Sequence, residues 1–242
     1  MLIKSYEERM ARQATRHNLV LGFLRDETWS SSLVLTDLLG GSPALTSKTM
    51  SQLEQQGHVA RHQIEPVRQL LWGITPHGLA HAWDSEDQMQ VRSYFEPSKL
   101  SPLAVPHHLD IQRARLKATR AGWADWIPEA LLPRGLAKRP DAVVRAPDGR
   151  RVAVEVERHV KTIKRYEAIF SAYLQAIRRG EYDEVHYLVP DHKFAVRLQR
   201  VFGLVASVSV IGERVQLTEK HKARFIVSAL QDWPSCQQHV NG

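Results

Sequence analysis

Three acidic side chains flank a short apolar hairpin in the second half of the chain. Asp141 begins one strand-like segment, and Glu155 and Glu157 end the next, after the turn at residues 147–150. Because successive side chains of a strand alternate between its faces, Glu155 and Glu157 point the same way, and the hairpin lets Asp141 approach them. Carboxylates this close repel one another unless a cation lies between them. The pattern predicts an Mg²⁺ or Mn²⁺ site, which could activate water against a phosphodiester.

Basic and phenolic side chains follow on a helix predicted for residues 159–179. Lys161 and Lys164 lie in its first turns, where they could contact a phosphate. Tyr166 and Tyr173 are possible nucleophiles in the same stretch, with Tyr166 the favoured one, although tyrosines on helices usually pack against other residues.

The elements that must position these residues have an α/β order. A helix at 109–122 is followed by strands at 139–144 and 151–157, the helix at 159–179 and a strand at 183–190. A further helix and an apolar strand at 205–211 complete the pattern. Strands with helices between them indicate an α/β or α+β domain, in which one more adjoining strand is expected.

The first half has a different pattern, that of a winged helix-turn-helix. Three helices, the third at 42–56, precede two short strands at 58–62 and 70–74 and a last helix that starts near Thr75. Ser42-Pro43 is a good helix start, and Gly57 a good helix end. The third helix could enter the major groove and the hairpin could touch the DNA backbone. The predicted DNA contacts are Thr46, Ser47, Lys48, Thr49 and Gln52 on the helix, with Arg61 and Arg68 on the wing. The alternative is a winged helix that contacts proteins.

Composition fits a basic, folded, two-part protein. The 242 residues carry a formal charge of +7, which suits a phosphate-rich partner without proving one. Prolines cluster in residues 96–107, so we expect domains at 1–95 and 108–242 joined by that linker. The single cysteine, Cys236, excludes an internal disulfide. No apolar stretch predicts a membrane span or a signal peptide, so a cytoplasmic location is expected. The twelve histidines look scattered, without a metal-binding triad.

The acidic residues also carry a family resemblance. Pro140-Asp141 and Glu155-x-Glu157 resemble the PD-(D/E)xK nuclease motif, with Glu157 where that motif has lysine. With the winged helix in front and Lys164-Arg165-Tyr166 behind, residues 15–190 resemble the replication-relaxation family, which includes MobC-type plasmid relaxases.

That resemblance implies a winged helix followed by a restriction-endonuclease-like domain that nicks DNA. The implied substrate is a plasmid transfer origin, in a relaxosome with accessory or coupling proteins and a divalent ion. Lys161 or Lys164 would replace the motif lysine, and Asp110, after His107-His108, would be an additional acid. Two alternatives stay open: a DNA-binding regulator or replication-initiation protein with an inactive nuclease-like domain, and a restriction endonuclease. Hydrolytic and covalent cleavage both stay open.

Overall fold

The chain divides into two compact units in the computed structural model, which describes residues 5–65, 69–83, 91–210 and 213–234. The units are Met1–Gln112 and Arg113–Gly242. The division falls inside one helix, α5 (Val105–Arg120), rather than in the linker expected at residues 96–107. Both units mix helices with β-sheet.

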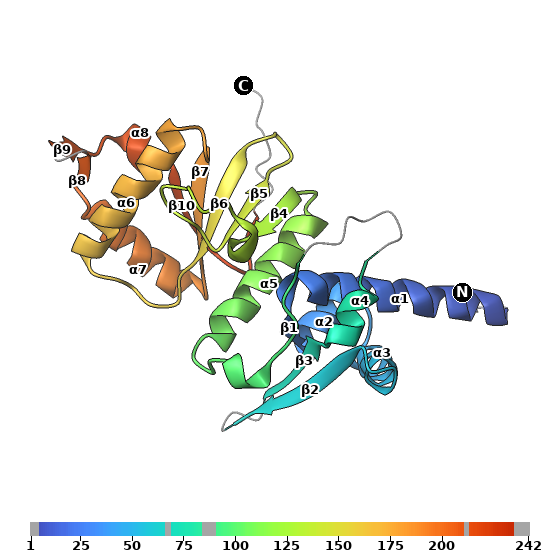
Figure 1. The fold of residues 1–242 in the computed structure, drawn as a ribbon. Helices are drawn as coiled ribbons and strands as arrows, with labels where there is room; N and C mark the ends of the chain where they lie inside the picture. Colours follow the sequence, from blue (N-terminus) through green and yellow to red (C-terminus); the bar gives the residue numbers. More distant parts are fainter. Residues whose placement is uncertain (1–4, 66–68, 84–90, 211–212, 235–242) are drawn as a thin grey trace. The chain divides into compact units, whose positions relative to one another are not determined.

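The first unit is a small sheet packed against three helices (Figure 1). Its elements before α5 are α1 (Tyr6–Glu27), β1 (Trp29–Ser31), α2 (Ser32–Leu39), α3 (Pro43–Gln55), β2 (Val59–Ile64), β3 (Gln69–Ile74), α4 (Pro76–Ala80) and the 3₁₀ turn η1 (Pro97–Lys99). The antiparallel sheet has the order β1-β3-β2. The helices and the hairpin follow in the predicted order, and β1 is an addition. Completely buried apolar side chains, among them Leu24, Leu35, Met50, Leu53, Leu71 and Ile74, form the core.

Local capping explains where the helices of this unit begin. The side chains of Ser31, Ser42 and Thr75 each accept a hydrogen bond from the backbone N–H three residues later. Such caps satisfy an N–H that the helix itself leaves without a partner. Proline at the first position of α3 and of α4 costs no hydrogen bond there, so the predicted start at Ser42-Pro43 is confirmed.

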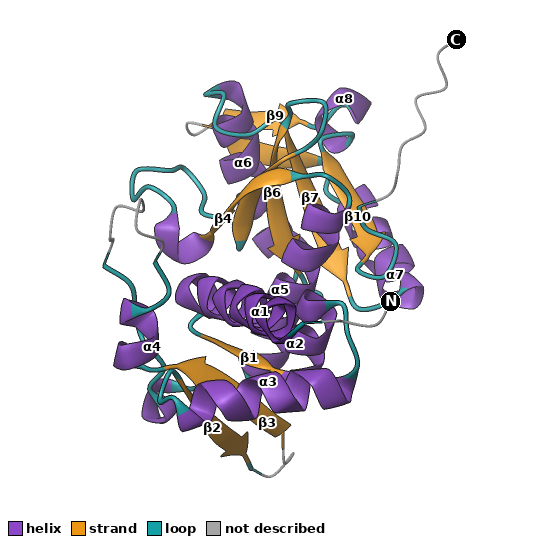
Figure 2. Ribbon diagram, turned by 90° about the vertical axis from the view of Figure 1, so that its right-hand side faces the viewer, coloured by secondary structure: helices purple, strands orange, loops and turns teal. Residues whose placement is uncertain are grey.

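The second unit is a five-stranded mixed sheet (Figure 2). Its elements are β4 (Ala124–Pro128), η2 (Glu129–Leu131), β5 (Ala142–Arg145), β6 (Arg151–Val156), α6 (Ile163–Arg178), β7 (Glu184–Val189), α7 (His192–Gly203), β8 (Ser207–Val210), β9 (Glu213–Gln216), α8 (Glu219–Lys222) and β10 (Phe225–Ala229). The strand order is β10-β7-β6-β5-β4. Neighbours among β4, β5 and β6 are antiparallel, whereas β7 is parallel to both β6 and β10.

Helices α6 and α7 cover one face of this sheet (Figure 1). Phe170 and Tyr173 of α6 and Phe202 of α7 pack with Ala153 and Val185 of the central strands in one buried cluster. The apolar residues of β6 are buried on both faces, which is typical of a strand inside a covered sheet.

Three expectations about this part of the chain were wrong in detail. The segment at 205–211 does not enter the large sheet: β8 pairs with β9 in a separate two-stranded sheet, and Ile211 lies outside the described residues. Strands β4 and β10, at the two edges of the sheet, are at positions where the sequence indicated no strand. Helix α5 begins at Val105, before the predicted Leu109, because Pro106 is tolerated in a first helical turn.

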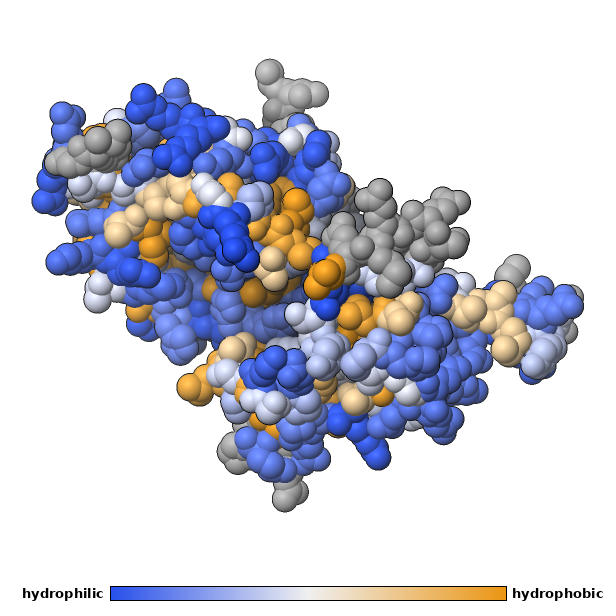
Figure 3. All heavy atoms as spheres, in the orientation of Figure 1, coloured by the Kyte–Doolittle hydropathy of each residue, from blue (hydrophilic) through white to orange (hydrophobic). Residues whose placement is uncertain are grey.

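No helix in the described ranges is both long enough and apolar enough to cross a membrane. Hydrophilic residues cover most of the visible face of each unit (Figure 3).

Candidate active site

Asp141 and Glu155 face each other across two paired strands of the second unit. The antiparallel register pairs Ala142 with Val154, so the preceding and following residues, Asp141 and Glu155, are opposite one another. The backbone N–H of Val156 donates to Oδ2 of Asp141 over 2.7 Å, which holds this carboxylate against the end of β6. Like charges directly opposite in a sheet are destabilising, so this pair needs compensation.

Part of the compensation comes from Lys138 and from α6. Nζ of Lys138 lies 2.7 Å from Oε1 of Glu155, and the hydroxyl of Tyr173 donates to the same oxygen. Burial and the nearby charge of Asp141 raise the pKa of Glu155, whereas Lys138 and Tyr173 lower it, and the net direction is upward. The protein therefore disfavours the charged form of Glu155 in spite of its two partners.

Glu157 lies just beyond the end of β6 in a separate set of contacts. Its Oε2 forms an ion pair with Lys161 and accepts a hydrogen bond of 3.2 Å from the hydroxyl of Tyr166. Only 4% of Glu157 is exposed. Among the residues described, Asp141, Glu155 and Glu157 do not bring one oxygen each within 4.8 Å of one another. The expected three-carboxylate cluster is thus an Asp141–Glu155 pair, with Glu157 held by a lysine.

A buried tyrosine beside these acids has an unsatisfied hydroxyl. Tyr187 pairs with Glu155 in the parallel register of β6 and β7, and only 2% of it is exposed. Its hydroxyl finds no hydrogen-bond partner within the described parts of the chain. Burial, and next the charge of Glu155, raise the pKa of Tyr187, so this group stays a neutral donor. An unpaired buried donor of this kind needs an explanation, and its place beside Glu155 makes it part of the candidate site.

The Asp141–Glu155 pair fits a divalent ion that prefers oxygen ligands. Mg²⁺ commonly uses one or two carboxylates and completes its shell with water and substrate phosphate. Asp141 and Glu155 would hold such an ion, which would supply charge neutralisation and an acidified water. Glu157 is not a third ligand in this arrangement, because among the described residues the three carboxylates do not bring one oxygen each within 4.8 Å of one another.

The remaining predicted site residues differ in accessibility. Lys161 reaches Glu157, whereas Lys164 is exposed. Tyr166 is completely buried, and burial raises its pKa further above the ordinary range of tyrosine. Both properties weaken it as a nucleophile toward DNA. Asp110 is buried in the part of α5 that belongs to the first unit.

Sequence reasoning missed Lys138 and Tyr187, and it considered Tyr173 only as a possible nucleophile and not as a partner of Glu155. Lys138 is three residues before Asp141 in the sequence, whereas the motif has its lysine after the second acidic residue, at the position of Glu157. The two tyrosines follow a helical or strand pattern that indicates only packing. Their contacts with Glu155 depend on the pairing of β6 with β7 and on the packing of α6.

The residues predicted to bind DNA divide into exposed and buried ones. Ser47, Lys48 and Arg61 are exposed, and Gln52 is half-buried with its side chain bonded to His17. Arg61 lies 3.2 Å from Glu54. Arg68 lies outside the described residues.

Thr46 and Thr49 do not support the DNA-contact prediction. They are 2% and 1% exposed, and their hydroxyls donate to the carbonyls of Ser42 and Leu45 one turn back. Both therefore belong to the core face of α3.

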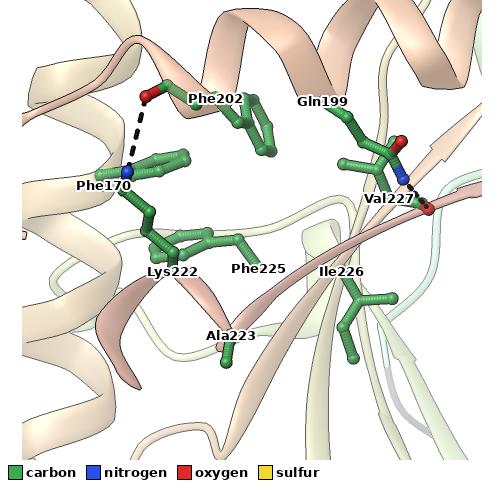
Figure 4. A pocket seen from close by; sticks show the side chains of 9 residues that line it. Phe170, Gln199, Phe202, Lys222, Ala223, Phe225, Ile226 and Val227 are labelled. Carbon is green, nitrogen blue, oxygen red and sulfur yellow. Dashed lines mark hydrogen bonds between the residues drawn. The ribbon is translucent and has the colours of Figure 1, made fainter. Parts of the chain in front are cut away.

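A cavity of this unit, away from the acidic residues, is apolar. It lies between α6, α7 and β10, where the rings of Phe170 and Phe225 stack 3.9 Å apart (Figure 4). Lys222 at its edge donates to the carbonyl of Gly203 over 3.5 Å. None of its lining residues is acidic, so it is not a candidate for metal chemistry.

Comparisons with known proteins identify no family for this chain. No family model and no curated protein matches the chain. Two solved structures of a doubly substituted Lactococcus lactis ZitR align in part. The apo form has a TM-score of 0.27 and 21% identity over 31% of this chain and 58% of that chain. The other has a TM-score of 0.26 and 23% identity over 28% of this chain and 47% of that chain. At these TM-scores the likeness carries no argument.

Proposed function

We propose that this chain is a metal-dependent DNA endonuclease that nicks one strand at a site selected by its first unit. The opposed carboxylates of Asp141 and Glu155, with Lys138 beside them, carry this proposal. The resemblance of residues 15–190 to the replication-relaxation family makes the substrate a plasmid transfer origin, and the role a mobilization relaxase.

The order of elements in the second unit supports the nuclease assignment. A helix, three antiparallel strands, a helix and a parallel strand follow one another from α5 to β7. This contains the order expected for a PD-(D/E)xK core. The acids lie at the start of β5 and the end of β6, where the resemblance to that motif requires them.

The positions of the lysines and tyrosines favour hydrolysis over a covalent intermediate. Lys138 holds a positive charge at Glu155, where it can also neutralise a scissile phosphate. Tyr166 and Tyr173 are completely buried and donate to carboxylates, so neither is available to attack DNA. Water, with its proton accepted by a carboxylate, is the proposed nucleophile.

The first unit has the order of a winged helix-turn-helix, which supports a role in DNA binding. The exposed side chains of Ser47 and Lys48 on α3 are its proposed groove contacts, and Arg61 on β2 its proposed backbone contact. A short helix with polar, basic side chains fits the major groove.

A plasmid relaxation assay tests the proposal. A supercoiled plasmid carrying DNA from beside the gene for this chain is incubated with protein and Mn²⁺ or Mg²⁺. We expect open circles, and a loss on the order of 100-fold or more with Asp141→Ala or Glu155→Ala. Asp148→Ala is the matched control, because Asp148 is an exposed carboxylate at the tip of the same hairpin. Equal activity in all three variants would contradict the assignment.

A second function is favoured by the same contacts. Glu155 and Glu157 already have lysine and tyrosine partners without an ion, and Glu157 replaces the motif lysine. These features suit a DNA-binding regulator or replication-initiation protein whose nuclease-like unit is inactive. Specific DNA binding without nicking would support it, and double-strand breaks would instead indicate a restriction endonuclease.

A further inference from the structure

Three histidines of the first unit, separated in sequence, meet at one point. His58 lies between α3 and β2, at the start of the hairpin. His77 lies on α4, and His81, one turn later, is the residue that ends this helix. One ring nitrogen from each lies within 4.8 Å of those of the other two. The ring centroids are 5.0, 4.6 and 4.5 Å apart, so the expectation of scattered histidines was wrong here.

Backbone contacts hold the two segments of this cluster together. The hydroxyl of Thr75 donates to the carbonyl of Gly57 over 2.6 Å, and the N–H of Thr75 donates to that of His58 over 3.0 Å. Gly78 lies against His58 so closely that a Cβ at this position would be 1.9 Å from the His58 carbonyl oxygen. The fold therefore sets the distance between the two backbone segments that carry the three histidines.

From this cluster we propose that His58, His77 and His81 form a binding site for one Zn²⁺ ion, with water as the fourth ligand. Three imidazoles and an open position are a known tetrahedral zinc set. Nitrogens bound to one such ion at about 2.0–2.1 Å lie about 3.3 Å apart, which small ring rotations reach from the observed spacing.

The protonation states suit a metal ligand. Nδ1 of His81 lies 3.0 Å from the His77 carbonyl, so a proton on Nδ1 leaves Nε2 free to coordinate. Nδ1 of His58 is buried and has no hydrogen-bond partner in the described parts of the chain. Burial, and next the charges of His81 and His77, lower the pKa of His58 and keep its ring neutral. Neutral imidazole is the form that binds metal.

An ion at this point would link α4 to the turn between α3 and β2. Because it would bind only the folded unit, it would raise the stability of that unit by mass action. The site is independent of the proposed nuclease centre, whose ligands are carboxylates of the second unit.

Metal titration of the full chain, prepared without a polyhistidine tag, tests the site. Co²⁺ absorption and Zn²⁺ calorimetry are measured in an Asp141→Ala background, which removes the acidic pair. We expect one ion per chain, and binding weakened by about 100-fold or more in His77→Gln and in His81→Gln, beyond the loss of an outer-shell partner. His192→Gln, an exposed histidine of the second unit, is the matched control and should bind as the background does.

Two results would overturn the zinc site: no stoichiometric binding, or binding that both His77→Gln and His81→Gln leave unchanged. Circular dichroism checks that the two variants are folded. We expect them to fold, because His77 and His81 are exposed. In protein with Asp141 intact, Zn²⁺ should also raise the melting temperature by a few degrees, and His77→Gln should abolish that rise. Failure of nicking alone would leave these results unchanged, so the two proposals are separable.

Discussion

At the scale of single residues, the proposed metal ligand Glu155 lowers the stability of the folded protein. Its charged form is disfavoured by burial and by Asp141, so its pKa is raised in the folded protein. A group with a raised pKa binds more protons when folded than when unfolded, and stability then falls as pH rises from the unfolded to the folded pKa. A buried carboxylate kept at such a cost is typical of a functional site, which supports the proposed role of Glu155.

Glu155→Gln should therefore stabilise the protein at neutral pH when no divalent ion is present. We expect a gain of about 1 kcal/mol in the free energy of unfolding, because glutamine mimics the protonated form without the buried charge. Urea unfolding at several pH values measures it, and the gain should disappear at pH values below the unfolded pKa. Glu213→Gln, on the exposed strand β9, is the control and should have no such effect. A loss of stability at neutral pH would show that the Lys138 pair outweighs burial.

Lys138 should be needed for nicking, although it stands outside the expected motif. Lys138→Met removes the charge that lies 2.7 Å from Glu155, so the pKa of Glu155 should rise further. We expect a rate loss on the order of 100-fold, and an acidic limb of the pH–rate profile displaced to higher pH. Lys138→Arg should restore part of the rate, and Lys193→Met, an exposed lysine of α7, should change nothing. An unchanged pH–rate profile in Lys138→Met would contradict an electrostatic role of Lys138 in nicking.

At the scale of elements, the close approach of α4 to the α3–β2 turn depends on one glycine. A Cβ on Gly78 would meet backbone atoms of His58 at 1.9, 2.7 and 2.9 Å, so the backbone would have to shift. Gly78→Ala should lower the free energy of unfolding of the first unit by about 1–3 kcal/mol.

Gly22→Ala is the matched control for that substitution. Gly22 lies within α1 with nothing within 4 Å of an added Cβ, so alanine should raise stability by about 0.5–1 kcal/mol. Urea unfolding of the two variants should move in opposite directions. Destabilisation by both would indicate a general intolerance and not the contact with His58.

Elements with local signals could be predicted from the sequence, whereas those defined by distant partners could not. Ser42-Pro43 marks the start of α3, and the alternation before Glu155 marks β6. β10 has no comparable signal, because its place depends on parallel pairing with β7. The same limit applies to the sites. The one-turn spacing of His77 and His81 is visible in the sequence, but the approach of His58 requires the packing of α4.

At the scale of the whole molecule, the proposed function assigns DNA binding to the first unit and cleavage to the second. The first unit has exposed polar and basic residues on α3, and the second has the paired carboxylates. If each unit performs one step, a substitution in one unit should change binding or cleavage but not both. The salt dependence of binding separates these steps, because each phosphate contact releases condensed counterions.

Lys48→Ala should therefore weaken binding to a random-sequence duplex and reduce the slope of log Kd against log salt by about 0.9, the loss of one phosphate contact. Fluorescence anisotropy between about 50 and 200 mM salt measures this slope. Thr49→Val, on the buried face of the same helix, should keep the full slope, since its hydroxyl donates only to Leu45. Asp141→Asn should keep the slope and lose nicking, whereas Lys48→Ala should still nick at saturating DNA. If Lys48→Ala leaves the slope intact, Lys48 makes no phosphate contact, and other exposed basic residues, such as Arg61 on β2, must supply the binding charge.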